Sequence, residues 1–394
     1  MNWYPLLAVL PFILAPALIA LVDAVPSVRA RRTAALAVEP TSTHDDFEVL
    51  VPIWGDVTYL ENEEFLADYP DKVILATTTS ESREFDRALE DLAARRRFRI
   101  VRADVPRTPT TRGGRRTVSG TVRDRVARTA ARAVTAKYVV CLDADTVPER
   151  PLGQLVGAME RHGLDVASVR ILPSNTGSVL GGLQHIEYRL SMNLRRLWPW
   201  LVSGACHAAT AEAYRRILDR HSLFFQGNDA EVGILAKVLG HKVGHVAYDV
   251  PTTVPSTPLR WWRQRFAWSG GEFRLSIVNL PVILRRFPLF SAYTAVMVLL
   301  LAPVRWANLI ELPLALGVAY GAYLALVVAS ERKVTPLAFL YPLYGLVGSM
   351  VLAVLSPISY VGMAANDRNA GLIRATPKEG RSPALRKMAA VVAR

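Results

Sequence analysis

The sequence contains very little cysteine: its 394 residues include only Cys141 and Cys206. Two cysteines are too few for the disulfide framework of a small secreted module, and they exclude a zinc site built mainly from cysteine. Acidic residues are also outnumbered, with 34 Asp and Glu against 47 Lys and Arg, so the formal net charge is +13. Apolar residues, at 51%, are too plentiful for a disordered chain. With a mean hydropathy of +0.21, the composition is not that of an average soluble protein.

Charge is absent from residues 3–22, a stretch of about the length that crosses a membrane as a helix. Basic residues are also absent before it, where a cleaved signal peptide carries them, whereas Arg29, Arg31 and Arg32 follow it. The positive-inside rule then places the N-terminus outside and the following domain in the cytoplasm. We therefore expect residues 1–25 to be an uncleaved anchor of a multi-pass protein of the plasma membrane.

Apolar segments return between residues 287 and 364, where we expect C-terminal transmembrane helices. Candidate segments lie near residues 288–304, 306–329 and 336–364. Three crossings would place the basic tail, residues 365–394, outside, whereas its lysines and arginines favour the cytoplasmic side. An even number of crossings, with the first segment re-entrant or interfacial, satisfies the charge rule.

Residues 44–256 have the pattern of one cytoplasmic α/β domain. Short apolar runs at residues 47–52, 72–76, 99–101 and 137–142 predict strands, and residues 118–135 have helical spacing. Strands that alternate with helices indicate a mainly parallel sheet. Because ligands bind beyond the C-terminal ends of such strands, functional residues are expected there.

Asp143 and Asp145 directly follow the strand expected at residues 137–142. Residues i and i+2 of an extended chain point to the same side, so the two carboxylates can converge. Paired oxygen ligands suit a hard divalent cation that also binds phosphates, such as Mg²⁺ or Mn²⁺. The alternative is structural, with Asp145 capping the next helix and Asp143 in a surface turn.

Two further sites follow along the chain. Asp229 opens a segment with helical spacing that runs to about Leu239, so it is either an N-terminal cap or a general base that Glu231 assists. Upstream, Gly204 and Ala205 are small residues that let a ligand approach the backbone closely. Their alternative interpretation is a packing turn.

Residues 257–286 are expected to form an amphipathic interface segment. Between Arg260 and Trp268 the chain carries three tryptophans and three arginines. These residues suit the headgroup level of a bilayer. They equally suit a site where an aromatic face stacks on a sugar and arginines hold a diphosphate.

In this order the motifs resemble those of the inverting family-2 glycosyltransferases, in particular the membrane-embedded hyaluronan, chitin and cellulose synthases. The similar stretches are Phe47-Glu-Val-Leu-Val-Pro-Ile-Trp54, Gly113-Gly114-Arg115-Arg116, Asp143-Ala144-Asp145, Val202-Ser203-Gly204-Ala205, Asp229 and Gln264-Arg265-Phe266-Ala267-Trp268. The third matches the Asp-x-Asp motif, and the last is similar to Gln-x-x-Arg-Trp.

The resemblance implies a GT-A fold that transfers sugar from a nucleoside-diphosphate sugar, with UDP as the expected nucleotide, to a growing polysaccharide that is exported. It makes Asp229 the catalytic base, and Asp143 and Asp145 the ligands of Mg²⁺ or Mn²⁺. The residues implied to bind the nucleotide sugar are Pro52, Arg115, Asp143, Asp145, Gln264 and Arg265. The acceptor-binding residues are Gly204, Ala205 and Trp268.

This sequence departs from the family pattern at several positions. Residues 77–81 read Thr-Thr-Thr-Ser-Glu where the family has aspartates, Asn228 replaces a carboxylate, and Ala267 replaces an arginine. Two alternatives therefore stay open: transfer of a single sugar to a polyprenyl phosphate or other lipid acceptor, and an inactive membrane scaffold.

Partners follow from the same observations. Thirteen arginines between Arg95 and Arg132 raise the possibility of nucleic-acid binding, but no nucleic-acid motif accompanies them, and anionic lipid explains them as well. We expect a nucleotide-sugar donor, a glycan or lipid-linked acceptor and a lipid bilayer as partners, and no nucleic acid. The oligomeric state stays open.

Overall fold

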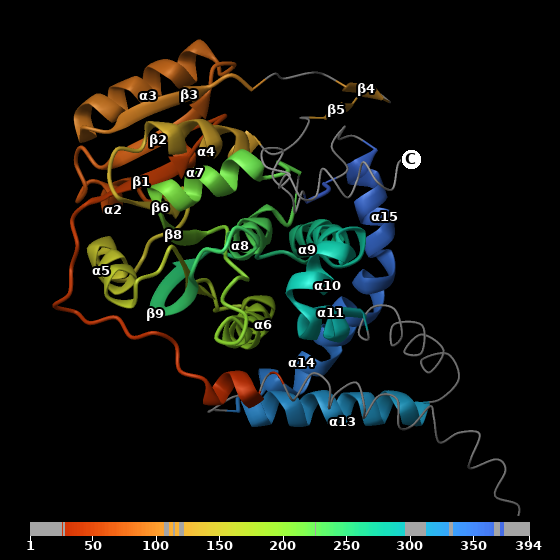
Figure 1. Ribbon diagram of the computed structural model, residues 1–394. Helices are drawn as coiled ribbons and strands as arrows, with labels where there is room; N and C mark the ends of the chain where they lie inside the picture. The colour runs from red at the N-terminus through yellow and green to blue at the C-terminus, as the bar shows by residue number, and fades with distance from the viewer. Residues whose placement is uncertain are drawn as a thin grey trace, which may run out of the picture.

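A computed structural model describes residues 26, 28–105, 110–112, 115–117, 122–224, 226–295, 313–330, 334–365 and 371–373 (Figure 1). The anchor expected at residues 1–25, the pair Gly113 and Gly114, and most of the basic tail lie outside the described residues.

The described chain is built on a seven-stranded sheet of order β3-β2-β1-β6-β8-β7-β9. Strand β8 is antiparallel to both of its neighbours, and the other neighbouring pairs are parallel. The expected α/β class with a mainly parallel sheet is confirmed. The strands are β1 (Phe47–Pro52), β2 (Val73–Thr78), β3 (Arg99–Ala103), β6 (Tyr138–Leu142), β7 (Val166–Pro173), β8 (Cys206–Thr210) and β9 (Val243–Thr252).

Helices cover both faces of this sheet. Successive residues of a strand point to opposite faces, so they enter two separate buried clusters. In β1, Val49 and Val51 join the cluster that contains helices α3 and α5, whereas Leu50 joins the one that contains α4, α7 and α8. The helices of the domain are η1 (Val57–Tyr59), α2 (Glu63–Leu66), α3 (Arg83–Arg96), α4 (Val122–Ala133), α5 (Leu152–His162), α6 (Val179–Leu194), α7 (Ala211–Arg220) and α8 (Asn228–Val238).

The strands predicted at the start of the domain are observed, but the second half of the sheet was not predicted. Strand β8, with the sequence Cys-His-Ala-Ala-Thr, lacks the alternation and the β-branched residues that signal a strand. The arginine-rich stretch contains a two-stranded antiparallel sheet of β4 (Thr110–Arg112) and β5 (Arg115–Thr117).

The C-terminal part is helical. Its elements are α9 (Pro258–Phe273), the π-helical turn η2 (Arg274–Val278), α10 (Leu280–Arg286), α11 (Pro288–Ala295), α13 (Pro313–Ser330), α14 (Leu337–Leu346), the π-helical turn η4 (Val347–Leu352) and α15 (Ala353–Ala364). Helix α9 begins at a side-chain cap from Thr257 and packs against α15, where Ser359 donates to the carbonyl of Phe266 at 2.7 Å. Within the described ranges, none of the helices combines the length and apolarity that a membrane crossing requires.

Candidate active site

The two aspartates predicted as metal ligands lie at the C-terminal end of β6, in the middle of the sheet. Because β8 runs antiparallel to β6, the end of β6 lies beside the start of β8, and Leu142 pairs with Cys206. The next pair along continues this contact, since the amide of Asp143 donates to the carbonyl of Ala205 at 2.9 Å. The strand pairing therefore brings the Gly204–Ala205 loop to the Asp-x-Asp motif.

The alternative in which Asp145 caps a helix does not apply. Helix α5 begins only at Leu152, and Pro151 is its N-cap. Asp145 is exposed, and its carboxylate accepts from the Thr146 hydroxyl at 3.1 Å. Burial raises the pKa of Asp143, and the neighbouring carboxylates of Asp145 and Asp229 raise it further, against the opposing effect of Arg123. Three carboxylates thus gather at one edge of the sheet.

Asp229 lies on the first turn of α8, yet it does not cap that helix. Gly227 occupies the N-cap position with a φ of 72°, a left-handed conformation that glycine adopts readily. The Oδ2 atom of Asp229 instead accepts a hydrogen bond from the backbone amide of Gly204 at 2.9 Å. The predicted base therefore faces the predicted acceptor loop.

Arg123 connects these groups and was not among the residues predicted from the sequence. Its Nε and Nη2 atoms donate to Oδ1 of Asp143 at 3.0 and 2.7 Å, and Nη2 also donates to the carbonyl of Gly204. Burial opposes the charge of this guanidinium, but Asp143 and Asp124 outweigh it and raise the pKa of Arg123. One cation thus spans the carboxylate predicted to bind the donor and the loop predicted to bind the acceptor.

A signal for Arg123 was present in the sequence. It lies on the first turn of α4, the helix that leads into β6. A helix that precedes a parallel strand begins at the C-terminal edge of the sheet, which is the ligand-binding edge. The resemblance implies Arg115 as a donor-binding cation instead. Arg115 lies in β5, its side chain is outside the described part of the structure, and its role stays a prediction.

Comparison with known proteins decides the family. A family model described as "Glycosyl transferase family group 2" matches residues 138–353, which is more than half of the chain. The chain belongs to this family. It is a family-2 glycosyltransferase.

One solved structure supports the fold of this glycosyltransferase, and a second is similar over a shorter part of the chain. The mannosyltransferase PcManGT from Pyrobaculum calidifontis, in complex with GDP-mannose and Mn²⁺, is 16% identical with a TM-score of 0.50, and the match covers 88% of this chain and 99% of that chain. A glucosyl-3-phosphoglycerate synthase from Mycobacterium tuberculosis, in complex with Mn²⁺, UDP and glucosyl-3-phosphoglycerate, is 17% identical over 66% of this chain and 82% of that chain, with a TM-score of 0.36. A search of curated protein sequences found no match. The GT-A fold is confirmed.

Glu81 lies in the loop after β2, where the family pattern has aspartates. Pro52 ends β1 and is buried, and the loop after it bends toward the end of β2. There Gly55 donates its amide to Glu81 at 3.0 Å, and the Thr78 hydroxyl donates to the same carboxylate. Glu81 therefore ties together the two loops that follow β1 and β2. Nucleotide binding by Pro52 stays a prediction.

Of the residues predicted on α9, Arg265 contacts α6. Arg265 is buried, donates to Glu187 at 2.7 Å and to the Oε1 atom of Gln264 at 2.8 Å, and lies 4.2 Å from the ring centre of Trp268. Burial opposes the charge of Arg265, but Glu187 outweighs it and raises the pKa of the guanidinium. This ion pair anchors α9. Donor binding by Gln264 and Arg265, and acceptor binding by the partly exposed Trp268, stay predictions.

The donor set at the sheet edge fits a divalent cation that also binds substrate. In the part of the chain that the structure describes, no group of three or more His, Cys, Asp or Glu side chains is arranged to hold a metal ion. Mg²⁺ and Mn²⁺ in nucleotide sites need only one or two carboxylates, because phosphate oxygens and water complete the coordination. Asp143 and Asp145 supply such a pair, and Asp145 and Asp229 lie close enough to add to the main effect of burial in raising the pKa of Asp143.

Proposed function

We propose that this glycosyltransferase inverts the anomeric carbon of its donor sugar, with Asp229 as the catalytic base. The observation that carries this proposal is the hydrogen-bonded chain from Asp143 through Arg123 and Gly204 to Asp229. It joins the carboxylate expected at the diphosphate to the carboxylate expected at the acceptor. A single displacement requires these two groups on opposite sides of the reacting carbon.

The reaction then follows from the positions of the side chains. Asp229 accepts the proton of an acceptor hydroxyl, and the oxygen forms a bond to the anomeric carbon from the face opposite the diphosphate. The bond from that carbon to the diphosphate oxygen breaks, and its electron pair leaves with the nucleoside diphosphate. Arg123 is placed to stabilise the negative charge of this leaving group. Asp143 and Asp145 would hold Mg²⁺ or Mn²⁺, which supplies further charge neutralisation when bound.

The acceptor in this proposal is a growing polysaccharide, as the resemblance to the membrane synthases implies. The alternative is the transfer of a single sugar to a polyprenyl phosphate. Both reactions use the same donor site, and they differ in the product. A ladder of products that lengthens with time supports the polysaccharide, whereas one lipid-soluble product of fixed size supports the alternative.

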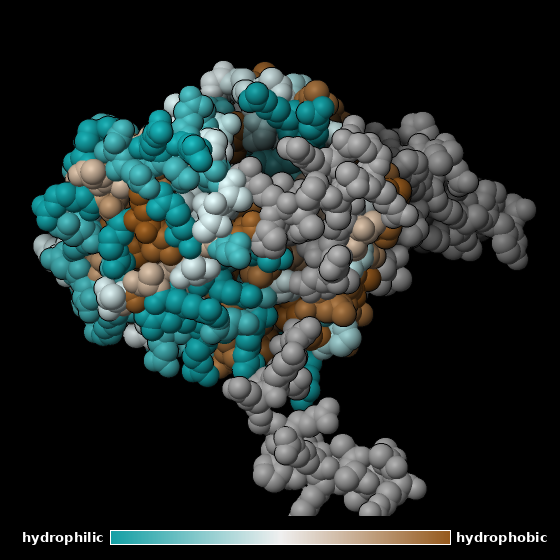
Figure 2. All heavy atoms as spheres, turned by 90° about the horizontal axis from the view of Figure 1, so that it is seen from above, coloured by the Kyte–Doolittle hydropathy of each residue, from teal (hydrophilic) through white to brown (hydrophobic). Residues whose placement is uncertain are grey.

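We also propose that the enzyme works at the plasma membrane with the catalytic domain in the cytoplasm. The apolar run at residues 3–22 supports this, and so do the exposed leucines beside cations on α10 and α11. Leu284 and Leu289 are exposed next to Arg285 and Arg286, with Leu289 at 76% exposure. In Figure 2 hydrophilic side chains dominate the left of the view, around one brown patch, and further brown side chains lie beside the grey atoms on the right. Apolar side chains flanked by arginine suit an interface with anionic lipid.

One experiment tests the donor and the metal together. Membranes that contain the full chain are offered radiolabelled GDP-mannose, the donor bound in the mannosyltransferase structure, and a panel of UDP-sugars, each with Mg²⁺, Mn²⁺ or EDTA. We expect incorporation from one donor, its loss in EDTA, and its loss in the Asp145→Ala variant. No incorporation from any donor would support the scaffold alternative. Transfer that persists in EDTA would reject the metal assignment.

Location has a test of its own. The full chain should sediment with membranes and stay there after extraction at alkaline pH. Release into the supernatant would reject the anchor.

A further inference from the structure

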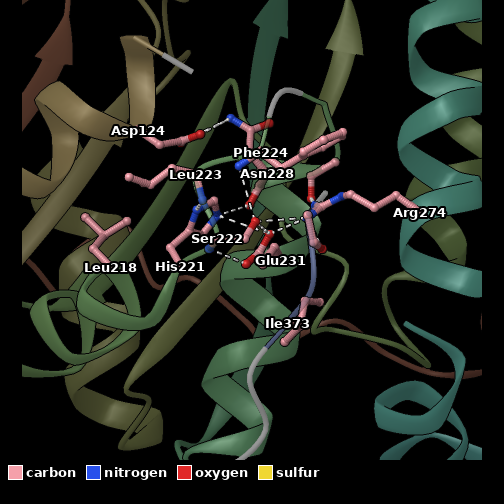
Figure 3. Close-up of polar contacts among 12 residues, drawn as sticks. Asp124, Leu218, His221, Ser222, Leu223, Phe224, Asn228, Glu231, Arg274 and Ile373 are labelled. Atoms are coloured by element: carbon pink, nitrogen blue, oxygen red, sulfur yellow. Dashed lines mark hydrogen bonds and ion pairs between the residues drawn. The ribbon is translucent and has the colours of Figure 1, made fainter. Parts of the chain in front are cut away.

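Two pairs of consecutive residues face each other across the active site. Arg123 and Asp124 are neighbours on α4, and Asn228 and Asp229 are neighbours on α8. Arg123 and Asp229 belong to the site described above. The remaining two, Asp124 and Asn228, contact each other directly (Figure 3).

The contact between Asp124 and Asn228 is a bifurcated hydrogen bond from one nitrogen to both carboxylate oxygens. The Nδ2 atom of Asn228 donates to Oδ1 of Asp124 at 3.1 Å and to Oδ2 at 2.9 Å. Asp124 is only 4% exposed, so the loss of this partner would leave a carboxylate in a place where water reaches it poorly. A carboxylate at position 228 would face that of Asp124 and repel it. The residue type at position 228 is therefore set by Asp124.

The backbone of Asn228 is fixed from another direction. Its carbonyl accepts from the Nε2 atom of His221 at 2.8 Å, while the Nδ1 atom of His221 accepts from the amide of Leu223 at 3.0 Å. These two contacts select the neutral tautomer that carries its proton on Nε2. A movement of Asn228 away from Asp124 would therefore also break the hydrogen bond between its carbonyl and His221.

The residues on both sides of Asp229 are held as well. The guanidinium of Arg274 lies in the interior, where it donates to Glu231 at 2.7 Å and to the carbonyl of Gly227 at 3.1 Å. Ser222 donates to the same carboxylate through its hydroxyl and its amide, both at 2.6 Å. Figure 3 shows these groups meeting at the first turn of α8. A shift of α4 relative to this turn would therefore strain the contact between Asp124 and Asn228.

We propose that Asp124 and Asn228 form a strut that sets the distance between Arg123, on the donor side, and Asp229, on the acceptor side. Asp124 and Asn228 are positioning residues, since each acts through its neighbour in the chain. The strut rests on the proposed function, because it presumes that Asp229 acts on the acceptor. The strut also explains why Asn228, and not a carboxylate, precedes the proposed base Asp229. The carboxylate of this contact is Asp124 on α4.

An exchange of the two side chains tests the strut. The variants are Asp124→Asn, Asn228→Asp and the double variant Asp124→Asn/Asn228→Asp, with Glu212→Gln as the control on an exposed carboxylate of α7. Kinetic constants for donor and acceptor and the midpoint of thermal unfolding are measured for each. We expect each single variant to lose on the order of 10- to 100-fold in kcat, because a misplaced base or cation loses the productive geometry. The double variant restores a carboxylate-amide pair and should recover kcat to within about threefold of the wild type, since contacting residues are not additive.

The measurements distinguish a strut that positions the site from a pair that only stabilises the fold. A double variant that regains the unfolding midpoint of the wild type but not its kcat would show a merely structural pair and overturn the proposal. Single variants with unchanged kcat would overturn it as well. If the wild type transfers no sugar, the proposed function fails on its own. In that case the unfolding midpoints still test the contact between Asp124 and Asn228. A double variant less stable than both single variants would reject it.

Discussion

The backbone amide of Gly204 donates a hydrogen bond to Oδ2 of Asp229 at 2.9 Å, across 25 positions of the chain. This bond orients the carboxylate toward the loop next to β8, and Arg123 holds the same loop by its Gly204 carbonyl. The peptide groups around Gly204 therefore connect the base to the cation. A change on either side of this loop should alter the geometry of the other side.

Asp229→Asn separates the basicity of the side chain from its hydrogen bond. An asparagine oxygen can still accept from the amide of Gly204, so the loop should keep its position. We expect kcat to fall by about 10²- to 10⁴-fold, the usual contribution of a general base, with nucleotide affinity nearly unchanged. Sugar transfer and calorimetric nucleotide binding are measured side by side, and Asp219→Asn on α7 is the control. Unchanged turnover would remove Asp229 as the base.

Arg123 variants test the cation that the sequence did not identify. Arg123→Gln removes the charge and should raise the KM for the donor and lower kcat, for a total loss of about 10- to 100-fold in kcat/KM, as expected for hydrogen bonds to charged groups. Arg123→Lys should recover only part of this, because lysine cannot span Asp143 and the Gly204 carbonyl with one planar group. Arg132→Gln, on the exposed side of the same helix, should leave kcat/KM unchanged. Equal effects of Gln at positions 123 and 132 would contradict the assignment.

Gly233→Ala tests how α8 is held against the loop before β8. A Cβ atom at Gly233 would lie 1.7 Å from the carbonyl oxygen of Trp200, so the helix that carries Asp229 would have to move. We expect a loss of about 1–3 kcal/mol in the free energy of unfolding, together with lower activity, measured by denaturant titration and by sugar transfer. Gly177→Ala is the matched control, because its Cβ would meet open space. A fully stable Gly233→Ala protein would show that the helix does not depend on this close approach.

Because His207 is buried, we expect the protein to lose stability in acid. His207 is 2% exposed, its Nδ1 atom bonds to the carbonyl of Ser203 at 3.0 Å, and burial, together with the charge of Arg123, lowers its pKa from 6.5 to about 4. Between these pH values the unfolded chain binds a proton that the folded chain does not, so stability falls as pH falls from 6.5 to 4. The shift corresponds to up to about 3 kcal/mol.

His207→Asn supplies the comparison for this prediction. An asparagine can donate to the Ser203 carbonyl but takes up no proton. The free energy of unfolding, measured by denaturant titration at several pH values, should therefore depend less on pH between 6.5 and 4 in the variant. His245, whose pKa burial lowers to about 3, contributes a slope of the same sign in both proteins. Identical slopes for the variant and the wild type would reject the assignment to His207.

The sequence by itself determined the class of the fold and predicted the three carboxylates that the structure brings together at one edge of the sheet. The buried run at residues 47–52 and the strand before Asp143 indicated a parallel sheet, because apolar runs of that length have to be covered on both faces. Asp143 and Asp145 could be predicted because the end of a strand and the spacing of two residues can both be read from the local sequence. Asp229 could be found because of its place at the start of a helix, together with the resemblance to the family.

The tertiary structure alone decided which of these groups meet. Strand β8 has no recognisable pattern, and its antiparallel pairing with β6 is a non-local choice that depends on how the whole sheet packs. That pairing brings the Gly204 loop to Asp143, and with it Asp229 to Arg123. The bond between Asp124 and Asn228 joins residues 104 positions apart. Local sequence patterns carry no information about such contacts, because the free energy that selects them comes from burial and charge compensation in the folded chain.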